Sequence, residues 1–116
     1  MHPEYGLWHS YRFALIGSAI EIDWQPPEVA SPCLECSEKP CLSRCPVGAF
    51  DGSGYAVEAC ASYLRQTPLA ECHALGCLAR YACPVAAELR YEPAQGRFHL
   101  QAFLAARAAR SPMFDR

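Results

Sequence analysis

Eight cysteines in a chain of 116 residues are the side chains best suited to do chemistry. This density is several times ordinary usage, so the cysteines are expected to share a chemical role rather than serve as incidental core residues. They are Cys33, Cys36, Cys41, Cys45, Cys60, Cys72, Cys77 and Cys83. Thiolates at short spacings are typical ligands of zinc and of iron–sulfur clusters.

The cellular compartment expected from the sequence excludes some of the possible roles of the cysteines. The N-terminus shows no basic region with a small-residue cleavage site, so we expect no secretory signal and a cytoplasmic location. Thiols stay reduced there, which disfavours a disulfide framework. The apolar run Phe13–Ile20 is far shorter than the roughly 20 residues that cross a membrane. The net charge of -2 provides no global field to attract nucleic acid or an anionic membrane.

The spacing of the cysteines favours iron–sulfur clusters over zinc. Two blocks of the sequence each end in Cys-Pro, at Cys45-Pro46 and at Cys83-Pro84. Bacterial two-cluster proteins carry runs with this ending, and the fourth cysteine of each run ligates the cluster of the other. A structural zinc site usually has two short cysteine pairs per ion, whereas this chain has one Cys-x2-Cys pair. A structural zinc protein with an interaction role remains the alternative.

The crossed pattern assigns all eight thiols to two 4Fe-4S clusters. The ligands expected for the first cluster are Cys33, Cys36, Cys41 and Cys83, and those for the second are Cys45, Cys60, Cys72 and Cys77. The assignment of Cys60 is the least secure by spacing, because it stands outside the compact motifs and would also suit a simple buried cysteine. His73 is an alternative ligand beside Cys72, although a core or solvent-facing histidine is the favoured interpretation.

The hydrophobic pattern predicts the elements that would position the first cysteine loop. Apolar and polar residues alternate from Tyr11 to Trp24, which is typical of a strand. Residues 26–32 resemble an extended linker. The segments on either side of residues 51–54 predict a small hairpin, because Asp51-Gly52-Ser53-Gly54 is a typical turn sequence.

Three helices are predicted after this hairpin. The first runs from about Val57 to Gln66, the second from Thr67-Pro68 to about Tyr81, and the third from Glu92-Pro93 to Ala109. Threonine can cap a helix start, and proline suits the first helical position. The arginines of the third helix are expected on a solvated face; they are Arg97, Arg107 and Arg110.

Four motifs resemble those of a known family. They are His2-Pro3-Glu4-Tyr5-Gly6-Leu7-Trp8, Cys45-Pro46-Val47-Gly48-Ala49, Cys60-Ala61-Ser62-Tyr63-Leu64 and Cys83-Pro84. The cysteine blocks resemble bacterial two-cluster ferredoxin domains. The longer match, over roughly residues 1–91, is to the iron–sulfur portion of epoxyqueuosine reductase, a cobalamin enzyme related to reductive dehalogenases. In that family the lone cysteine ligates the second cluster, so the resemblance implies this role for Cys60.

The chain also departs from the family. Four residues separate Cys36 from Cys41 where the family has two, a spacing more like that of iron–sulfur subunits of molybdenum oxidoreductases. The corrin-binding and catalytic part of the family lies before the matched segment. No catalytic residue is therefore carried over, and an electron carrier is expected rather than an enzyme acting alone.

Together the patterns predict an α+β fold, a helix-rich two-cluster ferredoxin-like domain with short β elements. Its expected parts within the single domain 1–116 are the N-terminal strand region and linker (1–30), the two-cluster region (31–90) and the C-terminal helix and tail (91–116). The expected function is electron transfer between redox partner proteins. The alternative is an electron-delivering module of a cobalamin-type reductase. A strand near Phe13 to Trp24 would have an open edge that needs a neighbour, and three sources are open: a partner protein, further strands of a longer chain, or local pairing.

Overall fold

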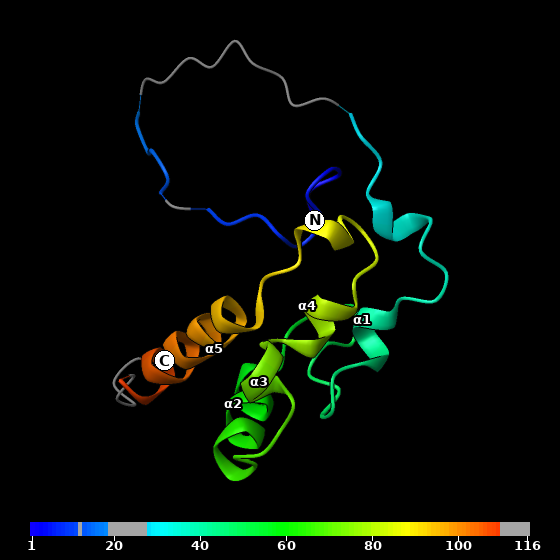
Figure 1. Cartoon of the computed structure of the whole chain (residues 1–116). Coiled ribbons are helices and arrows are strands. Elements are labelled where there is room, and N and C mark those ends of the chain that lie inside the picture. The colour runs from blue at the N-terminus through cyan, green and yellow to red at the C-terminus, as the bar shows by residue number, and fades with distance from the viewer. Residues whose placement is uncertain (12, 19–27, 110–116) are drawn as a thin grey trace.

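Helices are the main regular elements of the protein (Figure 1). The computed structural model describes residues 1–11, 13–18 and 28–109. In chain order the elements are η1 (Pro32–Leu34), α1 (Pro40–Ser43), α2 (Val57–Gln66), α3 (Cys72–Leu75), α4 (Leu78–Ala82), η2 (Ala87–Leu89) and α5 (Pro93–Ala108). Within these described ranges, bridges outside the helices join only single residue pairs, His2 with Gly6 and Phe50 with Tyr55. The predicted α+β class is therefore wrong, since the described residues form a helical domain without a sheet.

The predicted N-terminal strand is not formed over the residues that can be compared. Residues 13–18 have no regular structure, and Phe13, Leu15 and Ile16 are 81%, 82% and 98% exposed. The remainder of this prediction, residues 12 and 19–24, lies outside the described residues. Alternation alone does not make a strand, because its backbone groups need a neighbouring ladder. Within the described ranges the chain supplies no such ladder.

The predicted hairpin is reduced to one bridge around a well-bonded turn. Phe50 and Tyr55 form the bridge, and their rings stack with centroids 4.5 Å apart. The Asp51 carboxylate accepts hydrogen bonds from the backbone N–H groups of Ser53 (2.8 Å) and Gly54 (2.9 Å). The turn chemistry predicted from this sequence is therefore present, but without flanking strands.

Helix α2 occupies the predicted range, and the helix expected next is divided in two. Thr67 does not begin a helix; its N–H donates to the Tyr63 carbonyl and ends α2. Instead α3 starts at Cys72, and Gly76, with φ of +87°, separates it from α4. A positive φ favours glycine, so the break between the two short helices is encoded at this residue.

Helix α5 begins at the predicted proline and crosses α3 at close range. Gly96 of α5 faces the end of α3, where an added Cβ would overlap the Leu75 carbonyl oxygen and lie 2.9 Å from its carbonyl carbon. Gly76 approaches the same spot, since its Cβ would lie 3.0 Å from the Gly96 Cα. Two glycines thus let the backbones of α3 and α5 touch.

The core lies where α2, α3, α4 and α5 meet. Its buried members are Leu64, Cys72, Leu78 and Leu100, and the half-buried side chains packed on them are Cys60, Tyr63, Leu75, Phe103 and Leu104. Helix α1 packs beside α4 (Figure 1). Two of the cysteines expected to bind a cluster are thus part of the hydrophobic core or packed directly against it.

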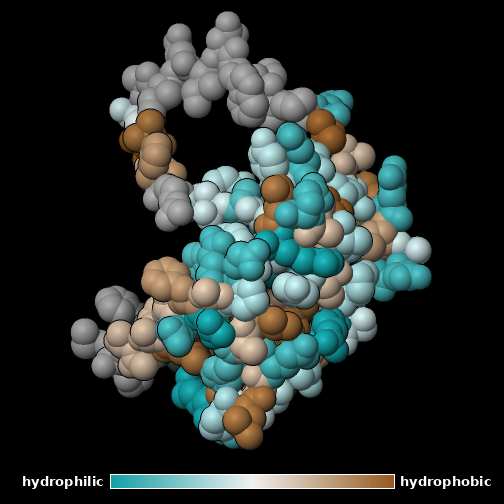
Figure 2. Space-filling view, in the orientation of Figure 1, coloured by the Kyte–Doolittle hydropathy of each residue, from teal (hydrophilic) through white to brown (hydrophobic). Residues whose placement is uncertain are grey.

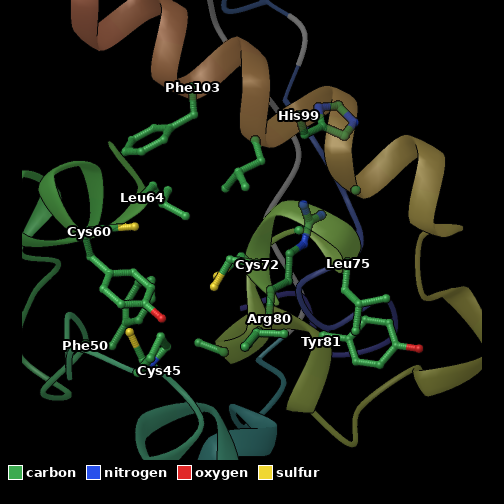
Figure 3. Close-up of a pocket in the computed structure, with 18 of the residues that line it drawn as sticks. Cys45, Phe50, Cys60, Leu64, Cys72, Leu75, Arg80, Tyr81, His99 and Phe103 are labelled. Atoms are coloured by element: carbon green, nitrogen blue, oxygen red, sulfur yellow. The ribbon is translucent and has the colours of Figure 1, made fainter. Parts of the chain in front are cut away.

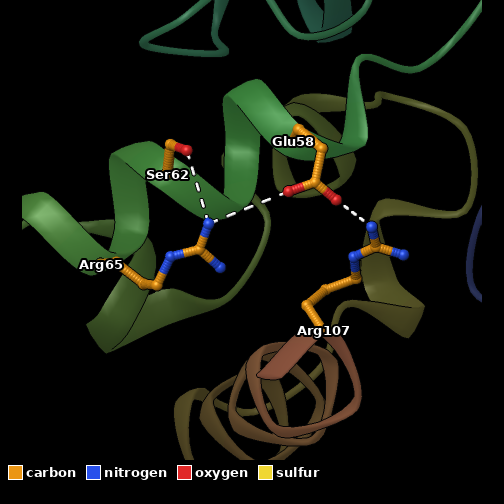
Figure 4. Close-up of polar contacts among 4 residues, drawn as sticks. All are labelled: Glu58, Ser62, Arg65 and Arg107. Carbon is orange, nitrogen blue, oxygen red and sulfur yellow. Dashed lines mark hydrogen bonds and ion pairs between the residues drawn. The ribbon is translucent and has the colours of Figure 1, made fainter. Parts of the chain in front are cut away.

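Charged side chains link α5 to α2 at the surface. Arg107 binds the Glu58 carboxylate, which also lies 3.9 Å from a guanidinium nitrogen of Arg65 (Figure 4). Arg107 was expected on a solvated face but is half-buried against this partner, whereas Arg97 is exposed as predicted. The expectation for Arg110 falls outside the described residues.

The face seen in Figure 2 carries apolar residues scattered among hydrophilic ones. Among the helices that the structure describes, none combines the length and apolar character needed to cross a membrane.

Candidate metal centre

Four thiols from four different parts of the fold line one cavity of about 260 Å³, called here the four-thiol cavity. Cys45 follows α1, Cys60 lies in α2, Cys72 opens α3, and Cys77 is the residue before α4. These are the four residues that the crossed pattern assigned to the second cluster. In Figure 3 the sulfurs of Cys45, Cys60 and Cys72 point into the same space.

The rest of the cavity wall is largely apolar and aromatic. Its apolar members include Phe50, Leu64 and Leu75, together with Leu100 and Phe103 of α5. Figure 3 shows α5 closing one side, with Phe103 above the thiols. A wall of this kind excludes water and lowers the local dielectric, which strengthens every electrostatic interaction inside it.

Polar hydrogens already surround the sulfurs. The Ala49 N–H donates to the Cys45 Sγ at 3.3 Å. Backbone N–H groups of Leu78 hydrogen-bond to Cys72, and those of Arg80 and Ala79 to Cys77. Such donors stabilise thiolates and the sulfurs of iron–sulfur clusters.

Burial shifts the titration of this site. It raises the pKa of the Cys72 and Cys77 thiols, and the backbone N–H groups only partly oppose this effect. The neighbouring thiols raise the pKa further, because one thiolate repels another. Burial also raises the pKa of the Tyr55 hydroxyl, as does its hydrogen bond to Cys60. A cationic group bound between the sulfurs would offset both the burial of the thiolates and their mutual repulsion.

The thiols assigned to the first cluster are less closely gathered. Cys33 and Cys41 line a second, wider cavity of about 650 Å³, together with Cys77. Cys36 and Cys83, both within the described chain, line neither cavity. Cys33 is exposed and its Sγ lies 3.6 Å from the Met1 sulfur, whereas Cys83 is 3% exposed.

His73 takes a structural position. Its Nε2 donates to the Leu64 carbonyl at 3.0 Å, since a carbonyl oxygen can only accept. The ring thus secures the last turn of α2 and does not line either cavity. In the described part of the chain, no group of three or more His, Cys, Asp or Glu side chains is arranged to hold a metal ion.

Two residues of the cavity wall had no role predicted from sequence. Arg80 of α4 lines both cavities, and Trp8 lines the four-thiol cavity. The Arg80 guanidinium carbon lies 4.8 Å from the Trp8 ring centroid and 4.5 Å from that of Tyr91. Its Nε donates to the Leu7 carbonyl at 2.7 Å. The one sequence signal for Trp8 was its place in the first motif, two residues after Gly6, and no motif included Arg80.

Comparison with known proteins gives no relative: no protein-family model, curated protein or solved structure matches this chain. The resemblance to the iron–sulfur portion of epoxyqueuosine reductase therefore stays a prediction from short motifs, and the case for function depends on the cavity itself.

Proposed function

We propose that the protein is an iron–sulfur electron-transfer protein and that its four-thiol cavity holds a 4Fe-4S cluster. The observation that carries the proposal is that Cys45, Cys60, Cys72 and Cys77 line one cavity. These residues come from separate elements, so neither a short loop nor a single helix brings them together. A cubane takes one thiolate per iron, which accounts for all four side chains.

The size of the cavity favours a cluster over a single ion. Its volume of about 260 Å³ far exceeds the about 10–15 Å³ that one water molecule needs on a comparable measure. Four thiolates on zinc would converge to about 2.3 Å from one point, and within the described residues no three of these side chains are grouped in that way. A polynuclear cluster instead keeps its ligands apart around an inorganic core.

The donor set also suits a cluster. The N–H groups directed at the Cys45, Cys72 and Cys77 sulfurs would stabilise a negatively charged centre. When bound, the cluster supplies one-electron oxidation and reduction. The chain then holds it, excludes water with the α5 side of the cavity, and sets its potential through burial and hydrogen bonds.

A second 4Fe-4S cluster on Cys33, Cys36, Cys41 and Cys83 is part of the same proposal. Cys33 and Cys41 already share the wide cavity. A cluster there would require Cys36 and Cys83 to turn toward it. Two adjacent centres would relay electrons between a donor protein and an acceptor protein.

Iron and acid-labile sulfide per chain test the proposal most directly. Anaerobically purified or reconstituted protein is expected to contain about eight of each if both sites fill, and about four if only the four-thiol cavity does. A brown colour bleached by dithionite should accompany them. Stoichiometric zinc without labile sulfide would overturn the proposal.

Two serine variants then locate the cluster. Cys72→Ser should lose the iron, sulfide and EPR signal of the four-thiol cavity. Ala59→Ser is the matched control, because it introduces the same side chain at an exposed position of α2. Retention of every iron in Cys72→Ser would contradict the assignment. Cys83→Ser and Cys45→Ser should damage different clusters if the ligands cross.

A further inference from the structure

Trp8 carries an unpartnered hydrogen-bond donor at the wall of the four-thiol cavity. Its indole Nε1 is buried and has no hydrogen-bond partner. Buried polar groups nearly always have one, so an orphan donor needs an explanation. The side-chain Nε atoms of Arg90 and Arg107 share this condition, but those residues do not line the cavity. Among these three, only the Trp8 donor belongs to the candidate site.

The position of the indole is fixed from several sides. Arg80 stacks over its ring at 4.8 Å, and the Tyr91 ring lies 5.2 Å away at an interplanar angle of 59°. The Trp8 backbone N–H donates to the Tyr5 carbonyl at 2.8 Å. Arg80 also binds the preceding residue through the Leu7 carbonyl. These contacts hold the indole against the cavity in the absence of any bond from its own N–H.

No acceptor on the cavity wall is bonded to this donor. The lining is mainly apolar, and besides the cysteine sulfurs it carries four tyrosine hydroxyls and His99. An indole N–H can only donate, so it is satisfied by an electron-rich atom placed in the cavity. The sulfurs of an iron–sulfur cluster and of its thiolate ligands are such atoms.

We propose that the Trp8 Nε1–H donates a hydrogen bond to a sulfur of the cluster in the four-thiol cavity and thereby tunes its potential. This inference rests on the proposed function. Reduction adds an electron to the cluster, and its sulfurs become stronger acceptors. The bond is therefore stronger in the reduced state, and it shifts the equilibrium toward reduction.

Trp8→Phe tests this role because it keeps an aromatic ring for Arg80 and removes the N–H. We expect iron and sulfide contents equal to those of the parent chain, and a more negative midpoint potential. At a fixed solution potential the ratio of reduced to oxidised cluster should fall roughly 3- to 10-fold, as for loss of one hydrogen bond. Tyr81→Phe is the control, since Figure 3 shows the Tyr81 hydroxyl pointing away from the thiols.

Pulsed EPR on the reduced parent protein gives a readout independent of any folding defect in the variant. With the indole nitrogens labelled with ¹⁵N, a ¹⁵N coupling to the cluster is expected. It should persist in Trp24→Phe, which leaves Trp8 as the sole tryptophan. A cluster that forms but shows no such coupling would overturn the inference while leaving the proposed function intact. Absence of any cluster would instead refute the proposed function, and the inference with it.

Discussion

The contact of α3 with α5 makes the effect of Gly96→Ala predictable in sign. Alanine is favoured over glycine in a helix by about 1 kcal/mol, so propensity alone predicts a more stable protein. The added Cβ, however, would overlap the Leu75 carbonyl oxygen. That atom belongs to the backbone and cannot turn aside, so relief requires α5 to move away from α3.

The magnitude follows from these two opposing terms. Overpacking in a tight interface costs about 1–3 kcal/mol, and the upper part of that range applies where backbone is struck. Subtracting the gain in propensity leaves a net loss of roughly 1–2 kcal/mol in the free energy of unfolding. For a domain of this size the melting temperature should fall by about 5–15 °C.

Two measurements test this prediction: the melting temperature and the rate at which the protein releases iron. Circular dichroism of Gly96→Ala and of Gln95→Ala, an exposed neighbour on α5, separates the contact from helix propensity. Gln95→Ala should change stability by no more than about 0.5 kcal/mol. Iron release to a chelator should quicken in Gly96→Ala, because α5 carries Leu100 and Phe103 on the cavity wall. A higher melting temperature for Gly96→Ala would refute the close contact.

Three other perturbations test the core, a turn and the surface. Leu64→Ala should lower the free energy of unfolding by about 2–5 kcal/mol in denaturant titrations, whereas Leu69→Ala, at a side chain 97% exposed, should stay within about 0.5 kcal/mol. The Ser53 hydroxyl and nearby backbone N–H groups lower the pKa of Asp51 below 3.8, so its ionised form stabilises the fold at neutral pH. Asp51→Asn should therefore melt lower at neutral pH, and the difference should vanish as the pH falls through the native pKa; a constant difference would contradict this reasoning. Glu58→Gln removes two ion pairs of an exposed carboxylate and should cost no more than about 1 kcal/mol, less at high salt; a larger, salt-independent loss would assign them a structural role.

The helices that sequence predicted well are those with local signals. Glu92-Pro93 marks the start of α5, because proline fits the first helical turn, and α2 has an apolar face that buries Ala61 and Leu64. The start at Thr67-Pro68 was wrong for an equally local reason. The Thr67 N–H donates to a carbonyl in the last turn of α2, and the next helix begins at Cys72.

The strand prediction was wrong because alternation gives evidence for an apolar face and none for a neighbouring strand. Alternation that begins at Phe13 and Leu15 describes a ribbon with one apolar face, but a strand also needs a partner ladder. No local pattern reveals whether that partner exists. The described residues show these side chains exposed, and the α+β class depended on them.

The cysteine pattern grouped four thiols that share one cavity, although it did not predict the fold. Spacing and the Cys-Pro endings placed Cys45, Cys72 and Cys77 in one set, and the family resemblance added Cys60; all four line one cavity, and cluster binding there stays a prediction. Three of them belong to or adjoin helices α2, α3 and α4, whose packing forms the core. The same hydrophobic burial that stabilises those helices therefore also positions the thiols.

The thiols assigned to the first cluster are not all held by buried helices, which explains why they are less closely gathered. Cys33 lies in the short η1 helix, which contains no buried residue, and Cys36 follows it in a loop. Contacts that close the cavities also join distant parts of the chain, such as the bond between Arg80 and Leu7, 73 residues apart. The spacing of residues along the sequence does not predict such contacts. If thiolate–metal bonds replace hydrophobic packing at the first site, binding there should depend more on cluster assembly, and the first four iron atoms should enter the four-thiol cavity.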